Sequence, residues 1–124
     1  MISSVYGISG VGSSNAYVAS KGTLNTMTLV LARALAPNVR VNAVCRGLIK
    51  TRWHTARFTG PADYEKFRGK YAESIALGKA CSADDVPGVA VGLIEHGDMI
   101  TGEMIKVDDG AHLGTPWRPL QGKT

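Results

Sequence analysis

The feature that most constrains the fold is a long segment, residues 15–36, that contains no proline and a single glycine, Gly22, and is closed by Pro37. This composition predicts one continuous helix, because proline is not accommodated beyond the first turn of a helix. Residues 29–36 are apolar all round the helix apart from Arg33. Such a helix must be covered on more than one side. The segment therefore predicts a helix that packs against a sheet and also against a further helix or a second subunit.

Three short segments predict the strands of a sheet. Residues 39–45 alternate valines with other residues between two turn signals, residues 104–107 form a last strand, and residues 1–5 are typical of the end of a strand. Glycine and serine dominate residues 7–14, which predicts a loop between the first strand and the long helix. Because a short run of β-branched residues is typical of a strand buried on both faces, we expect a parallel sheet.

Two shorter helices complete the expected elements. Pro61 stands where a first helical turn accepts proline and begins a helix that runs to about Ala76. Ser82 caps a second helix that ends near Gly97. The order strand, helix, strand, helix, helix, strand is typical of a parallel sheet with helical crossovers. The sequence thus predicts an α/β fold that is a portion of an open sheet with one unpaired edge.

Charge and composition exclude several classes of function. The formal net charge is +4, but the lysines and arginines are spread along the chain, which argues against nucleic-acid binding. No apolar run reaches the roughly 18 residues of a membrane span, and the amino terminus lacks a signal-peptide pattern. We therefore expect a cytoplasmic protein with no nucleic acid and no membrane among its partners.

The cysteines and histidines indicate neither a disulfide framework nor a metal site. Cys45 and Cys81 have no second cysteine or histidine at ligand spacing. The histidines also share no such spacing, and we expect all three to face solvent: His54, His96 and His112. The expected metal content is none.

Tyr17 and Lys21 are the candidate catalytic pair. They stand four residues apart on the long helix, so both side chains project from one face and the ammonium lies beside the phenol. A neighbouring cation stabilises the phenolate and makes the tyrosine a better proton donor and acceptor near neutral pH. Taken alone, such a pair also arises as two solvated residues at the start of a helix.

The motifs around this pair resemble the short-chain dehydrogenase/reductase family. Ser4 lies thirteen residues before Tyr17, which is the family's spacing between its active-site serine and its Tyr-x-x-x-Lys motif. Three later segments follow in the family's order, at residues 40–44, 100–103 and 107–108. The similarity runs from Met1 to about Leu113.

The resemblance implies a fold and an activity. Residues 1–113 would form the carboxyl-terminal half of a partial Rossmann-like, doubly wound parallel sheet, and residues 114–124 a tail. The activity would be that of an NAD(P)-dependent oxidoreductase acting on a small alcohol or ketone, with NAD or NADP as cofactor. The family's glycine-rich cofactor-binding half would precede Met1, so we interpret residues 7–12 as the loop before the long helix and not as the dinucleotide fingerprint.

The resemblance also implies the roles of individual residues. Ser4 would donate a hydrogen bond to the substrate oxygen, and Tyr17 would exchange a proton with it. Lys21 would assist the tyrosine, and both Tyr17 and Lys21 would hold the nicotinamide ribose. The loop after the second strand would contact the nicotinamide, through Gly47, Ile49 and Thr51.

Two positions depart from the family's pattern. Arg46 stands where the family usually has the proline of Pro-Gly, which puts a flexible cation next to the nicotinamide pocket. Asp109 stands where the family usually has the first glycine of Asp-Gly-Gly, and a non-glycine residue there disfavours a positive φ.

The region that shapes substrate pockets in the family covers residues 52–76. Trp53 and Phe58 are the candidates there for contact with an apolar or aromatic substrate. Further aromatic residues at helical spacing are expected in the core: Tyr64, Phe67 and Tyr71.

A second hypothesis comes from another class of function. The apolar helix and the unpaired sheet edge both need partners, so the chain is alternatively a non-catalytic remnant or an oligomerisation module that binds no cofactor. A homo-oligomer through residues 15–36 is expected under both hypotheses.

Overall fold

The computed structural model describes residues 1–12, 14–51 and 55–115. Its elements in chain order are β1 (Ile2–Ser4), α1 (Tyr6–Ser9), α2 (Asn15–Leu35), β2 (Ala43–Arg46), α4 (Pro61–Ser74), α5 (Asp85–His96), β3 (Met104–Val107) and the 3-10 turn η1 (Ala111–Leu113). The expected α/β class and the order of the main elements are confirmed. The interpretations of Trp53, of His54 and of tail residues 116–124 lie outside the described residues.

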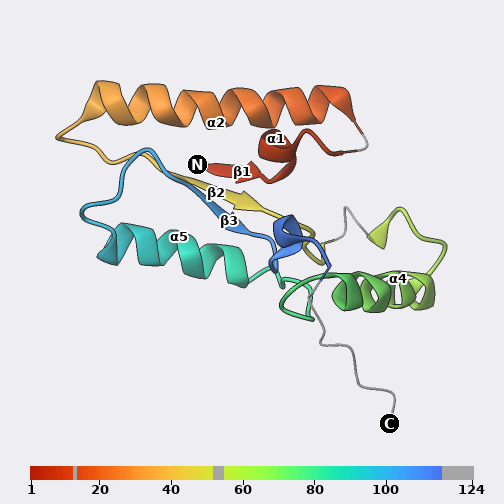
Figure 1. Ribbon diagram of the computed structural model, residues 1–124. Coiled ribbons are helices and arrows are strands. Elements are labelled where there is room, and N and C mark those ends of the chain that lie inside the picture. The colour runs from red at the N-terminus through yellow and green to blue at the C-terminus, as the bar shows by residue number, and fades with distance from the viewer. Residues whose placement is uncertain (13, 52–54, 116–124) are drawn as a thin grey trace, which may run out of the picture.

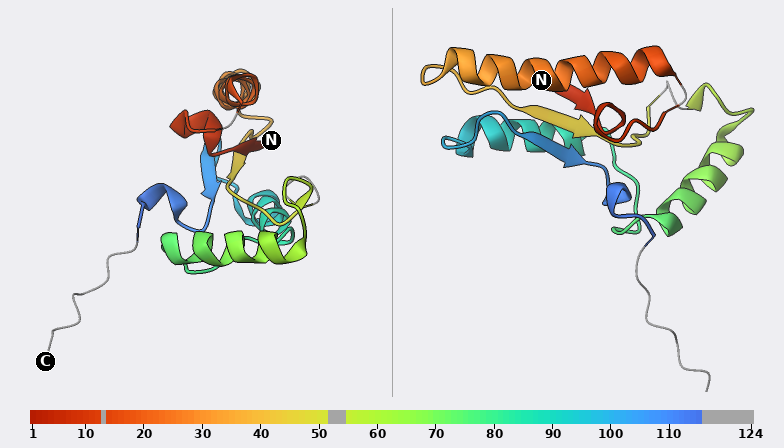
Figure 2. Two further views of the ribbon diagram at one scale, coloured as in Figure 1. Left: turned by 90° about the vertical axis from the view of Figure 1, so that its right-hand side faces the viewer. Right: turned by 45° about the horizontal axis from the view of Figure 1, so that its top comes forward.

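The sheet is parallel, with the strands in the order β1-β2-β3. Ile2 pairs with Val44, and Val44 pairs with Ile105. Parallel strands require crossover connections, which α2 supplies for the first pair and α4 with α5 for the second. α2 lies on one face of the sheet and α5 on the other, as Figures 1 and 2 show. The carboxyl ends of all three strands therefore lie at one edge of the molecule.

The two faces of the sheet have different cores. On the α5 side the buried residues are mostly aliphatic: Val44, Ile49, Cys81 and Val86. On the α2 side the contact is polar, because Ser3 Oγ donates a 2.5 Å hydrogen bond to Oδ1 of the buried Asn25. Thr28 is also fully buried there.

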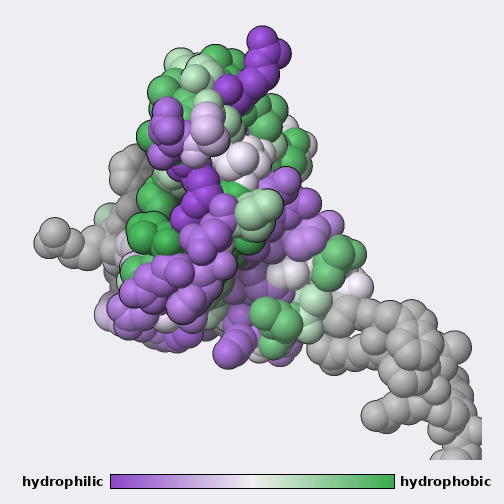
Figure 3. All heavy atoms as spheres, turned by 90° about the vertical axis from the view of Figure 1, so that its left-hand side faces the viewer, coloured by the Kyte–Doolittle hydropathy of each residue, from purple (hydrophilic) through white to green (hydrophobic). Residues whose placement is uncertain are grey.

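The apolar side of α2 is exposed in this chain. Its exposed apolar residues, between 41% and 56% accessible, are Met27, Leu29, Val30 and Leu35. Green, hydrophobic surface is visible at the top of Figure 3, over the end of α2. The expected packing against the sheet is present, but within the described residues the expected second layer is not.

Three expected boundaries differ from the structure. A helical turn, α1, occupies the start of the expected loop at residues 7–14. β2 begins at Ala43 and not at residue 39. α5 begins at Asp85 and not directly after Ser82. The Asp85 carboxylate accepts hydrogen bonds from Ser82 N at 2.6 Å and from Ser82 Oγ at 2.8 Å. Ser82 was expected to cap the helix, and it instead donates to a carboxylate of its first turn.

Candidate active site

The candidate site lies where the parallel strands end. Ser4 is the last residue of β1, Arg46 is the last residue of β2, and Tyr17 lies in the first turn of α2. The hydroxyl of Ser14, the residue before α2, accepts a 3.4 Å hydrogen bond from Tyr17 N and so fixes the start of the helix. Open α/β sheets bind ligands at this edge.

A groove of about 860 Å³ opens at this edge. Its lining residues come from α1, from the start of α2, from the end of β2 and from the segment after it: Tyr6, Ser14, Tyr17, Arg46, Gly47, Leu48, Ala56, Arg57, Phe58 and Phe67. Its volume lies in the range of small-molecule sites, which is about 300–1,000 Å³. Tyr17 is thus the predicted catalytic residue that lines the groove.

Lys21 lies beside Tyr17, as the spacing predicts. Its Nζ is 5.7 Å from the centroid of the Tyr17 ring and donates a 3.2 Å hydrogen bond to Ile2 O. An ammonium has three donors, so this contact with β1 leaves two for other partners. The bond holds the lysine between its helix and the sheet.

Ser4 is buried, with 2% of its surface exposed. Its Oγ accepts a 3.3 Å hydrogen bond from Tyr6 N at the start of α1. Within residues 1–12 and 14–51, no hydrogen bond joins Ser4 to Tyr17. The structure thus brings Tyr17 and Lys21 together, and it holds Ser4 at the adjacent strand end through a different contact.

Arg46 is a direct partner of Tyr17 that sequence reasoning did not assign to the site. Its Nη2 donates a 3.3 Å hydrogen bond to Tyr17 Oη, and its Nη1 donates to Gly47 O at 3.3 Å. The departure from Pro-Gly was visible in the sequence, but the direction of the side chain was not. The feature of the sequence that could have indicated this contact is a cationic residue directly before Gly47, at the end of a predicted strand.

The predicted nicotinamide contacts have different environments. Gly47 lines the groove and lies so close to β3 that a Cβ would be 2.8 Å from Asp108 Cα. Ile49 is buried, and its backbone forms a parallel bridge with Cys81. Thr51 is exposed. Packing explains the glycine and the isoleucine, and the predicted contacts with a nicotinamide stay predictions.

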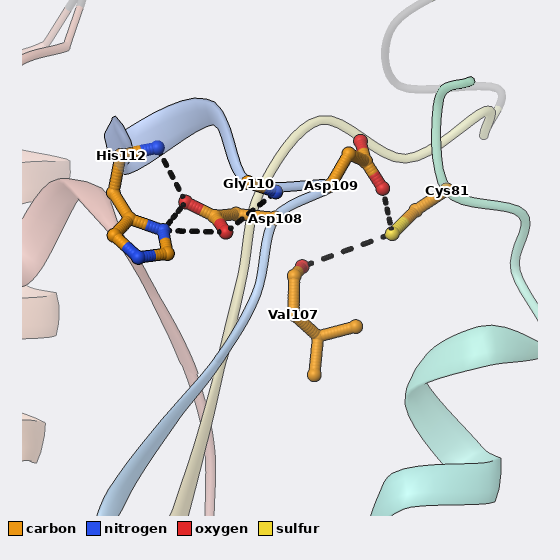
Figure 4. Close-up of polar contacts among 6 residues, drawn as sticks. All are labelled: Cys81, Val107, Asp108, Asp109, Gly110 and His112. Carbon is orange, nitrogen blue, oxygen red and sulfur yellow. Dashed lines mark hydrogen bonds and ion pairs between the residues drawn. The ribbon is translucent and has the colours of Figure 1, made fainter. Parts of the chain in front are cut away.

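The segment after β3 contains two buried carboxylates (Figure 4). Asp108 accepts hydrogen bonds from Gly110 N and His112 N, and its oxygens lie 2.9 Å from His112 Nδ1. His112 is exposed, as expected, and its ring also contacts the buried Asp108 carboxylate. Asp109 adopts a φ of +60°, so the backbone takes the left-handed conformation here without the family's glycine. An aspartate tolerates this conformation better than most residues.

Cys81 donates its thiol hydrogen to Asp109 Oδ1 (Figure 4). Burial of the thiol, together with this hydrogen bond and the nearby carboxylate, raises the pKa of Cys81 to about 12. Burial and the Asp109 and Asp108 charges likewise raise the pKa of Tyr71 to about 12. These groups stay protonated across the physiological range.

Aromatic residues form one wall of the groove. Phe58 packs edge-on against Tyr64 with ring centroids 5.4 Å apart, and it lies 5.1 Å from the ring of Phe67. Tyr64 is buried, as expected for a core residue. Phe67 is 39% exposed and lines the groove, so its assignment to the core is wrong. The prediction that Phe58 lies near a substrate is consistent with its place in this wall.

The described residues include neither a membrane-spanning helix nor a cluster of metal ligands. No described helix has the length and hydropathy needed to cross a membrane. No group of three or more histidine, cysteine or acidic side chains gathers at metal-binding distance among the residues that the structure describes.

Comparison with known proteins decides the family. A family model described as enoyl-(acyl carrier protein) reductase matches residues 1–112. The short-chain dehydrogenase/reductase homolog YusR of Bacillus subtilis is 37% identical over 112 residues, which cover 90% of this chain and 81% of that protein. The chain belongs to the short-chain dehydrogenase/reductase family.

Other members of the short-chain dehydrogenase/reductase family are much longer than the matched segment. The 3-oxoacyl-[acyl-carrier-protein] reductase FabG of Aquifex aeolicus is 43% identical over 112 residues, covering 88% of this chain and 42% of the relative. A solved small-chain dehydrogenase in complex with NADPH is 29% identical with a TM-score of 0.77, covering 91% of this chain and 50% of that one. The chain therefore spans about half the length, or less, of these two relatives.

Proposed function

We propose that this chain carries the proton-transfer residues of an NAD(P)-dependent oxidoreductase that interconverts a small alcohol and its carbonyl compound. The observation that supports the proposal is the placement of Tyr17 in the groove at the strand ends, with Lys21 Nζ 5.7 Å from its ring. Membership of the short-chain dehydrogenase/reductase family supports the same reaction type.

Tyr17 is the proposed proton donor and acceptor. Its oxygen accepts a hydrogen bond from Arg46, so its own hydrogen is available for a substrate oxygen. In the reductive direction, the proton passes from Tyr17 Oη to the carbonyl oxygen, and the carbonyl becomes an alcohol. The Lys21 ammonium stabilises the negative charge that remains on the phenolate.

Ser4 is the proposed second hydrogen-bond donor to the substrate oxygen. In the described chain its hydroxyl oxygen accepts from Tyr6 N, and its hydrogen has no acceptor. A hydroxyl that donates to the carbonyl oxygen stabilises the negative charge that develops there. Because Ser4 is buried, its hydroxyl must become exposed before it can contact a substrate.

The groove fits one part of a nicotinamide cofactor. Tyr17 and Gly47 line a volume suited to a small ring system, and Lys21 has two free donors for ribose hydroxyls. A reduced nicotinamide, when bound, supplies the hydride that a carbonyl carbon accepts. The homologous structure bound to NADPH supports NADP or NAD as the cofactor.

We propose that the glycines of residues 7–12 serve packing against α2 and not phosphate binding. A Cβ at Gly7 would lie 2.5 Å from Lys21 C, and one at Gly12 would lie 2.8 Å from Val18 Cγ2. These glycines therefore permit close contact of α1 and its following loop with α2. We propose that the phosphates of the cofactor are held by residues outside 1–124.

Replacing Tyr17 with phenylalanine tests the proposal. In the gene product that contains residues 1–124, Tyr17→Phe should lower kcat by roughly 10²- to 10⁴-fold, because the proton donor is lost. Affinity for NADH or NADPH should fall by less than about 10-fold, because only one hydrogen bond to the ribose is lost. Tyr71→Phe is the matched control and should leave kcat unchanged. Turnover retained by Tyr17→Phe would contradict the assignment.

The alternative function is an oligomerisation module without catalysis. The exposed apolar residues of α2 and the position of β1 at the edge of the sheet favour it. Titration with NADH and NADPH, followed by cofactor fluorescence, separates the two functions. We expect no micromolar binding by the isolated 124-residue chain and micromolar binding by the gene product that contains it. Absence of binding in both samples would favour the module.

A further inference from the structure

Arg46 is a half-buried cation in the groove, and no described carboxylate pairs with it. We propose that Arg46 binds a carboxylate of the substrate, carried within two carbons of the reacting carbonyl carbon. The inference rests on the proposed role of Tyr17 in proton transfer. It narrows the substrate class from carbonyl compounds in general to 2-oxo and 3-oxo acids and their hydroxy acids.

The charges around the groove favour an anion. Two guanidinium groups, Arg46 and Arg57, belong to its described lining, and none of the described lining residues is acidic. Asp108 is the nearby carboxylate, since its Cα lies against Gly47. Its oxygens are already engaged by His112 and by the backbone of the turn. A carboxylate supplied by a ligand would therefore meet a cation without competition from Asp108.

The hydrogen-bonding capacity of Arg46 leaves room for a ligand. A guanidinium carries five N–H donors, and this one uses a single donor on each Nη, to Tyr17 Oη and to Gly47 O. Arg46 lines the groove, and no further partner of its N–H groups is present among the described residues. Paired N–H groups of this kind match the two oxygens of a carboxylate.

The distance between Arg46 and Tyr17 sets the spacing within the substrate. Arg46 Nη2 lies 3.3 Å from Tyr17 Oη. A carbonyl oxygen would lie about 2.7 Å from the phenol oxygen, and a carboxylate oxygen about 2.8 Å from a guanidinium nitrogen. Because the two protein partners are neighbours, the two substrate groups must also be neighbours. A carboxylate far from the carbonyl would not reach Arg46 while the carbonyl contacts Tyr17.

The rest of the groove suits an apolar or aromatic remainder of the substrate. Phe58 and Phe67 form one wall, and Leu48 adds an aliphatic surface. Aromatic rings pack on such walls in offset or edge-on geometry. An aryl 2-oxo acid therefore combines the groups that the described lining would recognise.

A matched pair of probes tests the inference. Benzoylformate carries a carboxylate next to its ketone, and its methyl ester has the same ketone and phenyl group without the charge. Binding of each to the gene product that contains residues 1–124 is measured by isothermal titration calorimetry. We expect benzoylformate to bind about 10- to 100-fold more tightly than the ester, as expected for hydrogen bonds to a charged group. Equal affinities, or no binding of either probe, would overturn the inference.

Variants of Arg46 assign the preference to this side chain. Arg46→Gln should abolish the preference for the acid, while Arg46→Lys should retain part of it, because an ammonium keeps the charge but not the paired geometry. Arg33→Gln makes the same change in net charge in the last turn of α2, sixteen residues from Tyr17 and so about 24 Å along the helix. It should leave the preference intact. A preference that survives Arg46→Gln would exclude Arg46 as the carboxylate site.

Turnover separates this inference from the proposed function. Reduction of both probes with equal kcat/KM, unchanged in Arg46→Gln, would leave the oxidoreductase function in place and overturn the carboxylate site. Tight binding of benzoylformate that depends on Arg46, without reduction of either probe, would support the site and contradict the oxidoreductase function. The expected result is reduction of benzoylformate with a kcat/KM that falls about 10- to 100-fold in Arg46→Gln.

Discussion

Asp109 combines a strained backbone with a buried carboxylate. Its φ is +60°, it is 6% exposed, and its Oδ1 accepts the thiol hydrogen of Cys81. Its Oδ2 has no hydrogen-bond partner among the described residues. The family's usual glycine would avoid both features, so the aspartate has a structural cost at this position that the Cys81 contact offsets in part.

Two substitutions at Asp109 separate the backbone from the side chain. Asp109→Gly and Asp109→Ala both remove the carboxylate, but only glycine adopts a positive φ without strain. We expect Asp109→Gly to be more stable than Asp109→Ala, with a free energy of unfolding about 1 kcal/mol higher. Urea denaturation followed by circular dichroism measures the difference. Equal stabilities would show that the left-handed conformation is not maintained in solution.

The thiol of Cys81 makes the stability depend on pH in the alkaline range. Its pKa rises from 9.0 to about 12 on folding, so the folded chain holds this proton where the unfolded chain releases it. The stabilisation is complete below pH 9 and is lost as the pH rises toward 12, by at most about 1.4 kcal/mol per pH unit. Cys81→Ala should flatten the fall of the unfolding free energy between pH 9 and 12, leaving the smaller contributions of Tyr71 and Cys45. An unchanged slope in urea titrations over this range would contradict the assignment.

At the scale of elements, one arginine joins the segment before β2 to the end of α5. Arg40 Nη1 donates hydrogen bonds to Leu93 O at 3.0 Å and to Gly97 O at 2.5 Å. Its Nη2 donates to Ile94 O at 3.3 Å. The last carbonyls of a helix have no partners within the helix, and a cation there also meets the negative end of the helix dipole. Arg40 thus caps α5 from another part of the chain.

Removal of this cap should destabilise α5 selectively. Arg40→Met keeps the aliphatic part of the side chain but removes the donors, and we expect a loss of about 1–3 kcal/mol. Arg40→Lys should lose less, because one ammonium satisfies some of the carbonyls. Hydrogen exchange should accelerate in the last turn of α5 in Arg40→Met, with Arg33→Met as the control. Unchanged exchange in that turn would mean that the contacts do not stabilise the helix.

Hydrogen bonds that involve side chains explain in part why β2 begins later than the sequence predicts. Val41 N donates to Thr101 Oγ1 at 3.1 Å, and Asn42 Nδ2 donates to Ile100 O at 2.8 Å. These two hydrogen bonds join the segment to the loop before β3 through side chains, and Gly102 N also donates a backbone hydrogen bond to Val41 O at 2.7 Å. Alternation of apolar residues predicts a strand but cannot distinguish ladder pairing from side-chain pairing.

At the scale of the whole molecule, large apolar surfaces remain uncovered. The exposed residues of α2 include Leu29 and Val30, at 47% and 56% accessible. Val91 of α5 is 47% accessible. The helix α5 lies on the opposite face of the sheet from α2 (Figure 2). Apolar patches of this kind mark association surfaces. We propose that α2 joins two copies of the chain.

Charge substitutions test this association. Val30→Glu places a carboxylate in the proposed α2 interface and should shift the protein toward monomer in sedimentation velocity at micromolar concentration. Val91→Glu makes the same substitution on α5 and should leave the assembly unchanged. If only Val91→Glu dissociates the assembly, α5 and not α2 forms the interface.

Much of the fold and part of the site could be predicted from local pattern. The length of α2 and the bounds of β3 follow from residues that are near neighbours in the chain, where proline and apolar periodicity act. The Tyr17–Lys21 pair is predictable because a helix places residues four apart on one face. The short helix α1 and the groove contact of Phe67 were not predicted, because packing against distant segments decides both.

The sequence by itself determined the α/β class, the parallel sheet with helical crossovers and the Tyr17–Lys21 pair, because each depends on spacing along a single element or on the order of elements. Only the tertiary structure decided that Arg46 donates to Tyr17, that Arg40 caps α5 and that Cys81 donates to Asp109. These contacts join residues that are between 28 and 57 positions apart. The direction of a long side chain depends on the three-dimensional surroundings, which local sequence patterns do not encode.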